Sequence, residues 1–161
     1  MQFTNIMLMA LVAGLLWGTW FSLSRSMDTL SAQTFLDVGH TMIRNIAGPA
    51  RIVFPLTLLS GLVVTAMQWR WRRSAPFWFS VAGTILFIAT LIITLAIEVP
   101  IDNQIKTWTV ATLPPDWKTI QDRWEWHHTI RTFLALTSLG AFVAGSLLSN
   151  ETGMNYLGSR P

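Results

Sequence analysis

Long apolar stretches alternate with shorter polar segments along this chain. Four of the apolar stretches have about the length that a helix needs to cross a hydrocarbon layer. They cover residues 3–24, 52–69, 76–99 and 132–149. This pattern predicts an all-α protein, an integral membrane four-helix bundle that forms a single membrane domain over residues 1–161.

The composition agrees with a bilayer as the solvent. Of the 161 residues, 52% are hydrophobic and only 12% are charged, whereas soluble domains are about 25% charged. Cysteine is absent, which excludes disulfides, thiolate metal sites and cysteine nucleophiles. We therefore expect a multi-pass membrane protein surrounded by lipids.

The basic residues give a prediction of orientation. The formal net charge is +3, but the only dense basic run is Arg70, Arg72 and Arg73, in the short turn between the second and third stretches. Such a turn is typical of the cytoplasmic side of a membrane. We expect no nucleic-acid partner, a bacterial inner membrane location, and both termini in the cytoplasm.

A polar stripe runs through residues 28–47. Apolar residues recur there at helical intervals, and the opposite face carries Gln33, Asp37, His40 and Arg44. The pattern predicts an amphipathic helix after the first span, capped by Asp28, or an extension of that span followed by a break; Gly48 and Pro49 end it in either case. Its polar face is either solvated, with Asp37 paired to Arg44, or lines a pocket through His40 and Arg44.

The most polar part of the chain is residues 98–131. Pro100 is expected to end the third span, which leaves Glu98 in its last turn, where a carboxylate is a candidate functional group. Residues 114–116 (Pro-Pro-Asp) are a helix-start signal. A helix from there to residue 149 is about 50 Å long and therefore projects beyond a hydrocarbon layer of about 30 Å.

Small residues indicate which helix faces pack together. On the first span they are Ala10, Gly14, Gly18 and Ser22, and on the last span Ala135, Ser138 and Gly145. At about 100° per residue, Arg131 and Trp124 share the small-residue face of the last helix. His127 and His128 lie on either side of Arg131, and periodicity alone slightly favours His127.

Seven tryptophans lie near the expected ends of the spans. They are Trp69, Trp71, Trp78, Trp108, Trp117, Trp124 and Trp126. This placement predicts anchors at the membrane interface, with stacking on an aromatic ligand as the alternative.

Arg131 needs an anionic or hydrogen-bonding partner where the last helix enters the membrane. Glu98 is the expected partner, and in the first interpretation the two tie helices together in a salt bridge. Alternatively, the pair with Asn103 and a histidine stabilises negative charge on a substrate oxygen while the histidine moves a proton.

A metal site is a further alternative to be weighed. His40, Glu98 and one of His127 or His128 would form a set of two histidines and one carboxylate. The sequence contains no HxxxH or HxH spacing, and its ExxH spacing, Glu125 and His128, is not part of this set. We therefore expect no cofactor, and the metal site is the weaker hypothesis.

Several motifs together resemble the DUF1772 or anthrone-oxygenase-like family of small four-helix membrane proteins. These are GTWFSLS at 18–24, then EVPIDNQIKTW, LPPDW and DRWEWHHTIR between residues 98 and 131. The matching residues are Val99, Pro100, Ile101, Asn103, His128 and Arg131. The chain departs from the family pattern at SMDTLS, residues 26–31, and at Asp102, where many relatives have Asn.

The resemblance implies a function. Some members are implicated in oxidising anthrones to anthraquinones with molecular oxygen and without a classical redox cofactor. His128 would then be the base, with Arg131, Asn103 and Glu98 around the substrate oxygen. The substrate-binding candidates are His40, Arg44, Trp124 and His127.

A second function of a different class is kept beside this one. The chain would be a non-enzymatic membrane subunit, or a quinone- or lipid-binding protein of a larger complex. The expected partners are accordingly a lipophilic small molecule, another membrane protein or a second copy of the chain.

Overall fold

The fold is all-α, as predicted. The computed structural model describes the backbone of residues 1–158 and the side chains of residues 1–24 and 26–149. The α-helices are α1 (Gln2–Ser22), α2 (Ala32–Met67), α3 (Ala75–Ile93), α4 (Val99–Ile105) and α5 (Trp117–Gly158). Short helical turns connect them: η1 (Ser24–Thr29), η2 (Trp69–Trp71), η3 (Thr94–Glu98) and η4 (Val110–Thr112).

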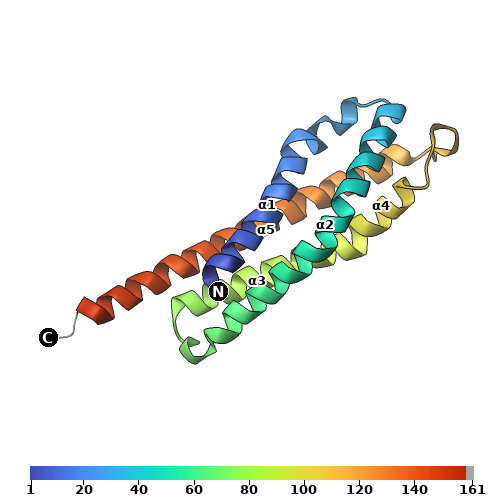
Figure 1. The fold of residues 1–161 in the computed structure, drawn as a ribbon. Helices are drawn as coiled ribbons and strands as arrows, with labels where there is room; N and C mark the ends of the chain where they lie inside the picture. Colours follow the sequence, from blue (N-terminus) through green and yellow to red (C-terminus); the bar gives the residue numbers. More distant parts are fainter. Residues whose placement is uncertain (159–161) are drawn as a thin grey trace.

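Four helical stretches are long and apolar enough to cross a membrane. They are Gln2–Thr29, Ala32–Met67, Ala75–Ile105 and Trp117–Ser149. They pack lengthwise into an elongated bundle in which α5 runs past the whole of α3 (Figure 1). The chain is therefore a multi-pass integral membrane protein.

The predicted separate amphipathic helix does not exist. Residues 32–67 form one continuous helix, α2, which passes through Pro49 and Pro55. Ser31 caps it by accepting a hydrogen bond from the Thr34 amide at 3.2 Å, so Asp28 is not the cap. Proline fixes a helical φ and removes one backbone hydrogen bond, a loss that neighbouring helices compensate in a membrane bundle.

Pro100 does not end the third span either. The helical chain continues from α3 through one wide π-helical turn, η3, into α4. The third span therefore ends at Ile105. In that turn the Val99 amide donates to the carbonyl of Thr94, five residues earlier. The wider turn gives the Pro100 ring room beside the preceding carbonyls, so the helix continues with a bulge instead of stopping.

The last helix begins directly after the Pro-Pro-Asp signal, as predicted, and extends beyond residue 149. Its small-residue face is buried: Ala135 and Ser138 are inaccessible to solvent. Ser138 Oγ donates to the carbonyl of Gly83 on α3 at 2.7 Å. The inward face predicted for this helix is confirmed.

The small-residue stripe of α1 has a different environment from the one predicted. A Cβ atom at Gly14 or Gly18 would meet no atom within 4 Å. The buried side of α1 carries larger side chains, among them Met9, Val12 and Leu16. Contact within this chain therefore uses the large residues of α1, and at Gly14 and Gly18 the predicted packing against another helix is not formed within it.

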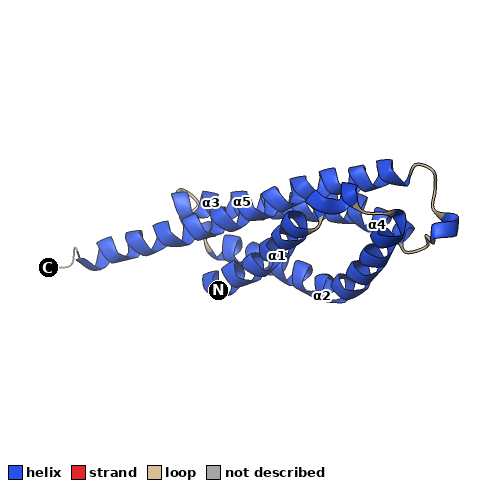
Figure 2. Ribbon diagram, turned by 90° about the horizontal axis from the view of Figure 1, so that it is seen from above, coloured by secondary structure: helices blue, strands red, loops and turns tan. Residues whose placement is uncertain are grey.

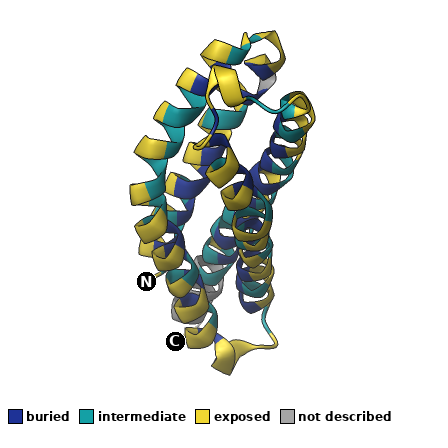
Figure 3. Ribbon diagram, turned by 90° about the vertical axis from the view of Figure 1, so that its right-hand side faces the viewer, coloured by how far each residue is buried: buried dark blue, intermediate teal, exposed yellow. Residues whose placement is uncertain are grey.

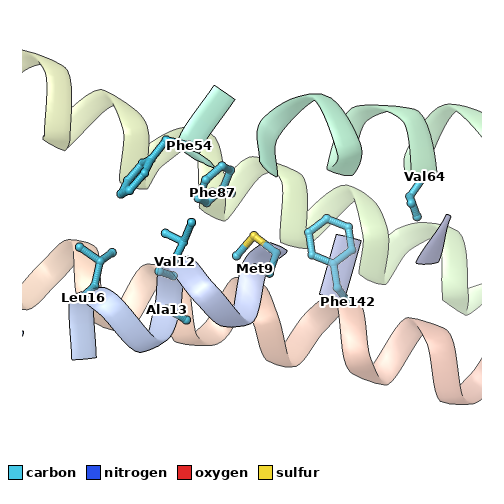
Figure 4. Close-up of a cluster of buried hydrophobic side chains, with 9 residues drawn as sticks. Met9, Val12, Ala13, Leu16, Phe54, Val64, Phe87 and Phe142 are labelled. Atoms are coloured by element: carbon cyan, nitrogen blue, oxygen red, sulfur yellow. The ribbon is translucent and has the colours of Figure 1, made fainter. Parts of the chain in front are cut away.

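Two apolar clusters form the core of the bundle. The first, drawn in Figure 4, consists of Met9, Val12, Ala13, Leu16, Phe54, Val64, Phe87, Ala135 and Phe142. The second consists of Met27, Phe35, Leu36, Ile101, Ile105, Trp108 and Trp124. Buried residues face the bundle interior and exposed ones face outward along each helix (Figure 3).

The tryptophans divide between these environments. Trp69, Trp71, Trp78 and Trp126 are exposed, which fits interfacial anchors. Trp108 and Trp124 are buried in the second cluster, so the interface prediction was wrong for these two. Their burial follows from the continuation of the third span to Ile105, which covers them.

Candidate functional site

A cavity of about 540 Å³ lies between the helices in the half of the bundle near α4. In this half α2 curves away from α5 (Figure 2). The cavity wall is mainly apolar and includes Leu16, Phe35, Met42, Ile43, Phe54, Leu58, Leu91 and Leu95. Its size is within the range of small-molecule sites, about 300–1,000 Å³. Polar residues from α4 and α5 also line it, and they define the candidate site.

Arg131 lies at the centre of the polar residues. Its NH2 is 2.9 Å from Oε2 of Glu98, and its NH1 donates to Oγ1 of Thr94 at 3.2 Å. Glu98 is only 1% exposed and Arg131 only 9%. The predicted pairing of Glu98 with Arg131 is therefore present, and it joins α5 to the π-helical turn. Arg131 lines the cavity, whereas its partner Glu98 does not.

The same guanidinium fixes the tautomer of His128. Nδ1 of the histidine lies 3.2 Å from Arg131 Nε and 2.8 Å from NH2. Guanidinium nitrogens only donate hydrogen bonds, so Nδ1 accepts and carries no proton. Nε2 therefore carries the hydrogen and donates to the Leu16 carbonyl on α1 at 3.3 Å. Both ring nitrogens of a neutral His128 are engaged.

Trp124 connects His128 to a second carboxylate. The Trp124 and His128 rings are stacked with centroids 4.7 Å apart and an interplanar angle of 4°. Trp124 Nε1 donates to Oδ1 of Asp102 at 3.1 Å. Asp102, Trp124, His128 and Arg131 all line the cavity.

Asp102 is the residue that sequence reasoning missed. It was noted only as a departure from the family pattern, because the third span was expected to end at Pro100. Glu98 and Asp102 are four residues apart, the spacing of neighbours on one helix face. This spacing could have indicated that Asp102 lies near Glu98, but only if the third span was expected to continue past Pro100.

The other predicted site residues are dispersed. Asn103 lines the cavity, but its Oδ1 accepts a hydrogen bond from Lys106 Nζ at 3.1 Å. His127 is outside the cavity and donates from Nδ1 to the Arg123 carbonyl at 2.7 Å. Of the two adjacent histidines, His128 is thus the one that faces the cavity.

The two candidates on α2 do not join the polar residues. His40 Nε2 donates to the Ile105 carbonyl at 2.8 Å and ties α2 to α4. Arg44 is exposed and is not part of the cavity wall. Asp37 accepts hydrogen bonds from Gln33, so the predicted pairing with Arg44 is not formed either.

The three side chains of the metal-site hypothesis are not brought together. In the described part of the chain, no three histidine or carboxylate side chains are arranged to hold a metal ion. His40 and Glu98 have separate partners, the Ile105 carbonyl and Arg131.

The fold and cavity define a class: a membrane-embedded helical bundle with an apolar chamber and one preorganised polar region. A sequence model of the anthrone oxygenase family matches residues 44–141, more than half of the chain. The chain therefore belongs to the anthrone oxygenase family, as the motifs predicted. The matched range contains Glu98, Asp102, His128 and Arg131. Comparisons with curated proteins and with solved structures give no match.

Proposed function

We propose that this protein oxidises a lipophilic aromatic substrate with molecular oxygen inside the cavity. The observation that carries the proposal is the cavity itself, where a mainly apolar wall adjoins His128, Arg131 and Asp102. A substrate dissolved in the bilayer would place its rings against the wall and its polar edge at these side chains. Family membership supports an oxygenase-type reaction.

The proposed reaction converts an activated ring CH₂ group and O₂ into a ring carbonyl and one water molecule. A base removes one proton from the CH₂ group, and the resulting carbanion is delocalised onto the substrate oxygen. The carbanion reduces O₂ and forms a carbon–oxygen bond, and the peroxide takes up the proton. Loss of the second C–H proton with the outer oxygen as water leaves the carbonyl. Arg131 and Asn103 stabilise the anionic oxygen.

The base is His128 in this proposal, with a condition that the geometry imposes. Its Nδ1 accepts from Arg131, so it can take a proton only after the guanidinium turns toward the substrate oxygen. Asp102 is the alternative acceptor: Trp124 bonds its Oδ1, and among the described residues no hydrogen bond reaches its Oδ2. Substitutions at the two positions distinguish these routes.

The test is oxygen consumption by the purified protein in lipid nanodiscs with an anthrone, corrected for the protein-free rate. His128→Gln keeps an acceptor for Arg131 and removes the base, so turnover should fall by about 100-fold or more. Asp102→Asn should lose much less, and Asp122→Asn, at an exposed position, serves as the matched control. A fully active His128→Gln beside an inactive Asp102→Asn would transfer the role of base to Asp102.

A second function is favoured by one observation. Nε, NH1 and NH2 of Arg131 and both ring nitrogens of His128 already have partners within the protein. Such a network suits a protein that binds a lipophilic ligand, such as a quinone or a lipid, without turnover. Oxygen uptake would then equal the protein-free rate for every aromatic tested, while ligand binding persisted. A stable membrane partner or homo-oligomer in a native pull-down would support this function.

We also propose that both termini and the basic turn face the cytoplasm of a bacterial inner membrane. The polar region of the cavity then lies toward the opposite side. Because the chain has no cysteine, single cysteines at exposed positions 73 and 116 give a clean test with a membrane-impermeant thiol reagent. In intact cells only position 116 should react, and the reverse pattern would invert the topology.

A further inference from the structure

Arg51 is a charged residue of the cavity wall that the polar network does not use. It lies on α2 directly before the apolar stretch of residues 52–69, and it lines the cavity with a side chain that is also exposed at the surface of the bundle. In the described part of the chain, it forms no hydrogen bond or ion pair. A charged side chain in a membrane-spanning helix is costly and marks a functional position by default.

The register of the helices places Arg51 at the level of the polar network. A Cβ at Gly39 on α2 would lie 3.5 Å from Ile105, and one at Gly61 would lie 3.6 Å from Thr84. These contacts show that α2 runs antiparallel to the third span. Counting from them, Arg51 lies at about the level of Thr94. Because Thr94 accepts a hydrogen bond from Arg131, Arg51 and Arg131 line one cavity at a similar level along the bundle.

The charges around the cavity do not balance without a ligand. Arg131 is compensated by Glu98. Lys106 and Asp102, four residues apart on one helix, carry opposite charges that offset each other. Arg51 is left as one uncompensated positive charge on a mainly apolar cavity.

We propose that Arg51 forms an anion-binding subsite of this cavity. It holds a carboxylate, phenolate or phosphate oxygen of a lipophilic molecule whose apolar body lies against the wall. The aromatic nature of that molecule rests on the proposed function, whereas the requirement for an anionic group rests on the charge of the cavity. A guanidinium binds such planar oxygen groups with two parallel hydrogen bonds.

The experiment compares a charged and a neutral probe of the same shape. Anthracene-9-carboxylate and its methyl ester are titrated, without oxygen, against the full chain in phosphate-free maltoside detergent, and binding is followed by fluorescence. The wild type should bind the carboxylate about tenfold or more tightly than the ester. Arg51→Gln should remove this preference, Arg51→Lys should retain part of it, and Arg123→Gln, at an exposed position outside the cavity, should leave it unchanged.

Three outcomes would overturn the proposal. They are equal binding of acid and ester by the wild type, an unchanged preference in Arg51→Gln, and a lost preference in Arg123→Gln. A phospholipid retained by the wild type but not by Arg51→Gln in native mass spectrometry, without any preference for the aromatic acid, would assign the subsite to a lipid headgroup and overturn the aromatic ligand. Because binding is measured without turnover, absence of oxygen uptake would refute the proposed reaction and leave this result standing.

Discussion

The same helices pack differently in the two halves of this bundle: they lie in close contact near the basic turn and surround a cavity near α4. Near the basic turn, glycines let helices touch: a Cβ at Gly83 would lie 2.8 Å from the Phe142 ring, and one at Gly61 3.2 Å from it. Near α4, the same helices surround a cavity of about 540 Å³. Close packing of small residues is a main source of helix association in lipid, so the open half needs another source.

Polar contacts between helices supply it. Arg131 ties α5 to η3 through Glu98, His128 ties α5 to α1 through the Leu16 carbonyl, and His40 ties α2 to α4. Such contacts hold helices at fixed positions without filling the space between them. The comparison teaches that the cavity half relies on polar contacts between helices in addition to its apolar cluster, and the following predictions test this.

The largest effect is expected from Glu98→Gln. Removing the carboxylate leaves Arg131 as a buried charge without compensation, which costs about 3–5 kcal/mol in the free energy of unfolding. Thermal unfolding in detergent measures the loss. Adding Arg131→Met to Glu98→Gln should recover part of the stability, because no buried charge then remains. Unchanged stability in the single variant would mean that the ion pair does not hold the open half.

The next largest effect is expected in the close-packed half, from Gly83→Ala. The added methyl group would overlap the Phe142 ring, and overpacking of this kind costs about 1–3 kcal/mol. Gly140→Ala is the matched control, since a Cβ there meets no atom within 4 Å. It should be neutral or slightly stabilising. If the two variants melt alike, this half is not closely packed.

A smaller effect is expected from His40→Ala. It removes the 2.8 Å hydrogen bond to the Ile105 carbonyl and should cost about 1 kcal/mol. His127→Ala removes a bond within one helix, to the Arg123 carbonyl, and should change stability less. A larger loss from His127→Ala would contradict the view that bonds between helices stabilise the open half.

The smallest effect on stability is expected from Ala47→Phe. Ala47 lines the cavity, so the larger side chain has space without overpacking, and the melting temperature should change by less than it does in His40→Ala. Binding of anthracene-9-carboxylate should weaken about tenfold, because the ring occupies ligand space. A strong loss of stability would show that the cavity is too small for a ligand.

Much of the fold was predictable because it depends on local composition. The apolar stretches gave the four spans, and the Pro-Pro-Asp signal gave the start of α5. The prolines at 49 and 100 were misread as helix ends, because a sequence shows the lost amide hydrogen bond but not the neighbouring helices or the wider turn that accommodates it. The interface prediction for Trp108 and Trp124 failed because the sequence does not show that the third span continues to Ile105 and covers these side chains.

The candidate site was less predictable. The pairing of Glu98 with Arg131 followed from the rule that a boundary arginine needs an anionic partner. The place of Asp102 in the cavity wall did not, because it required the continuous helix. His40 and Arg44 share a polar stripe with helical spacing, yet one bonds to a backbone carbonyl and the other faces outward.

The sequence by itself determined that four apolar helices span the membrane and that the charges gather where the third and fourth spans meet. Apolarity over the length of a helix is a local property, and it is what allows a helix to cross the hydrocarbon layer. Only the tertiary structure decided which charges meet and that they border a cavity. Those facts depend on the π-helical turn, the curvature of α2 and the register between antiparallel helices, which are set by packing between residues far apart in the chain.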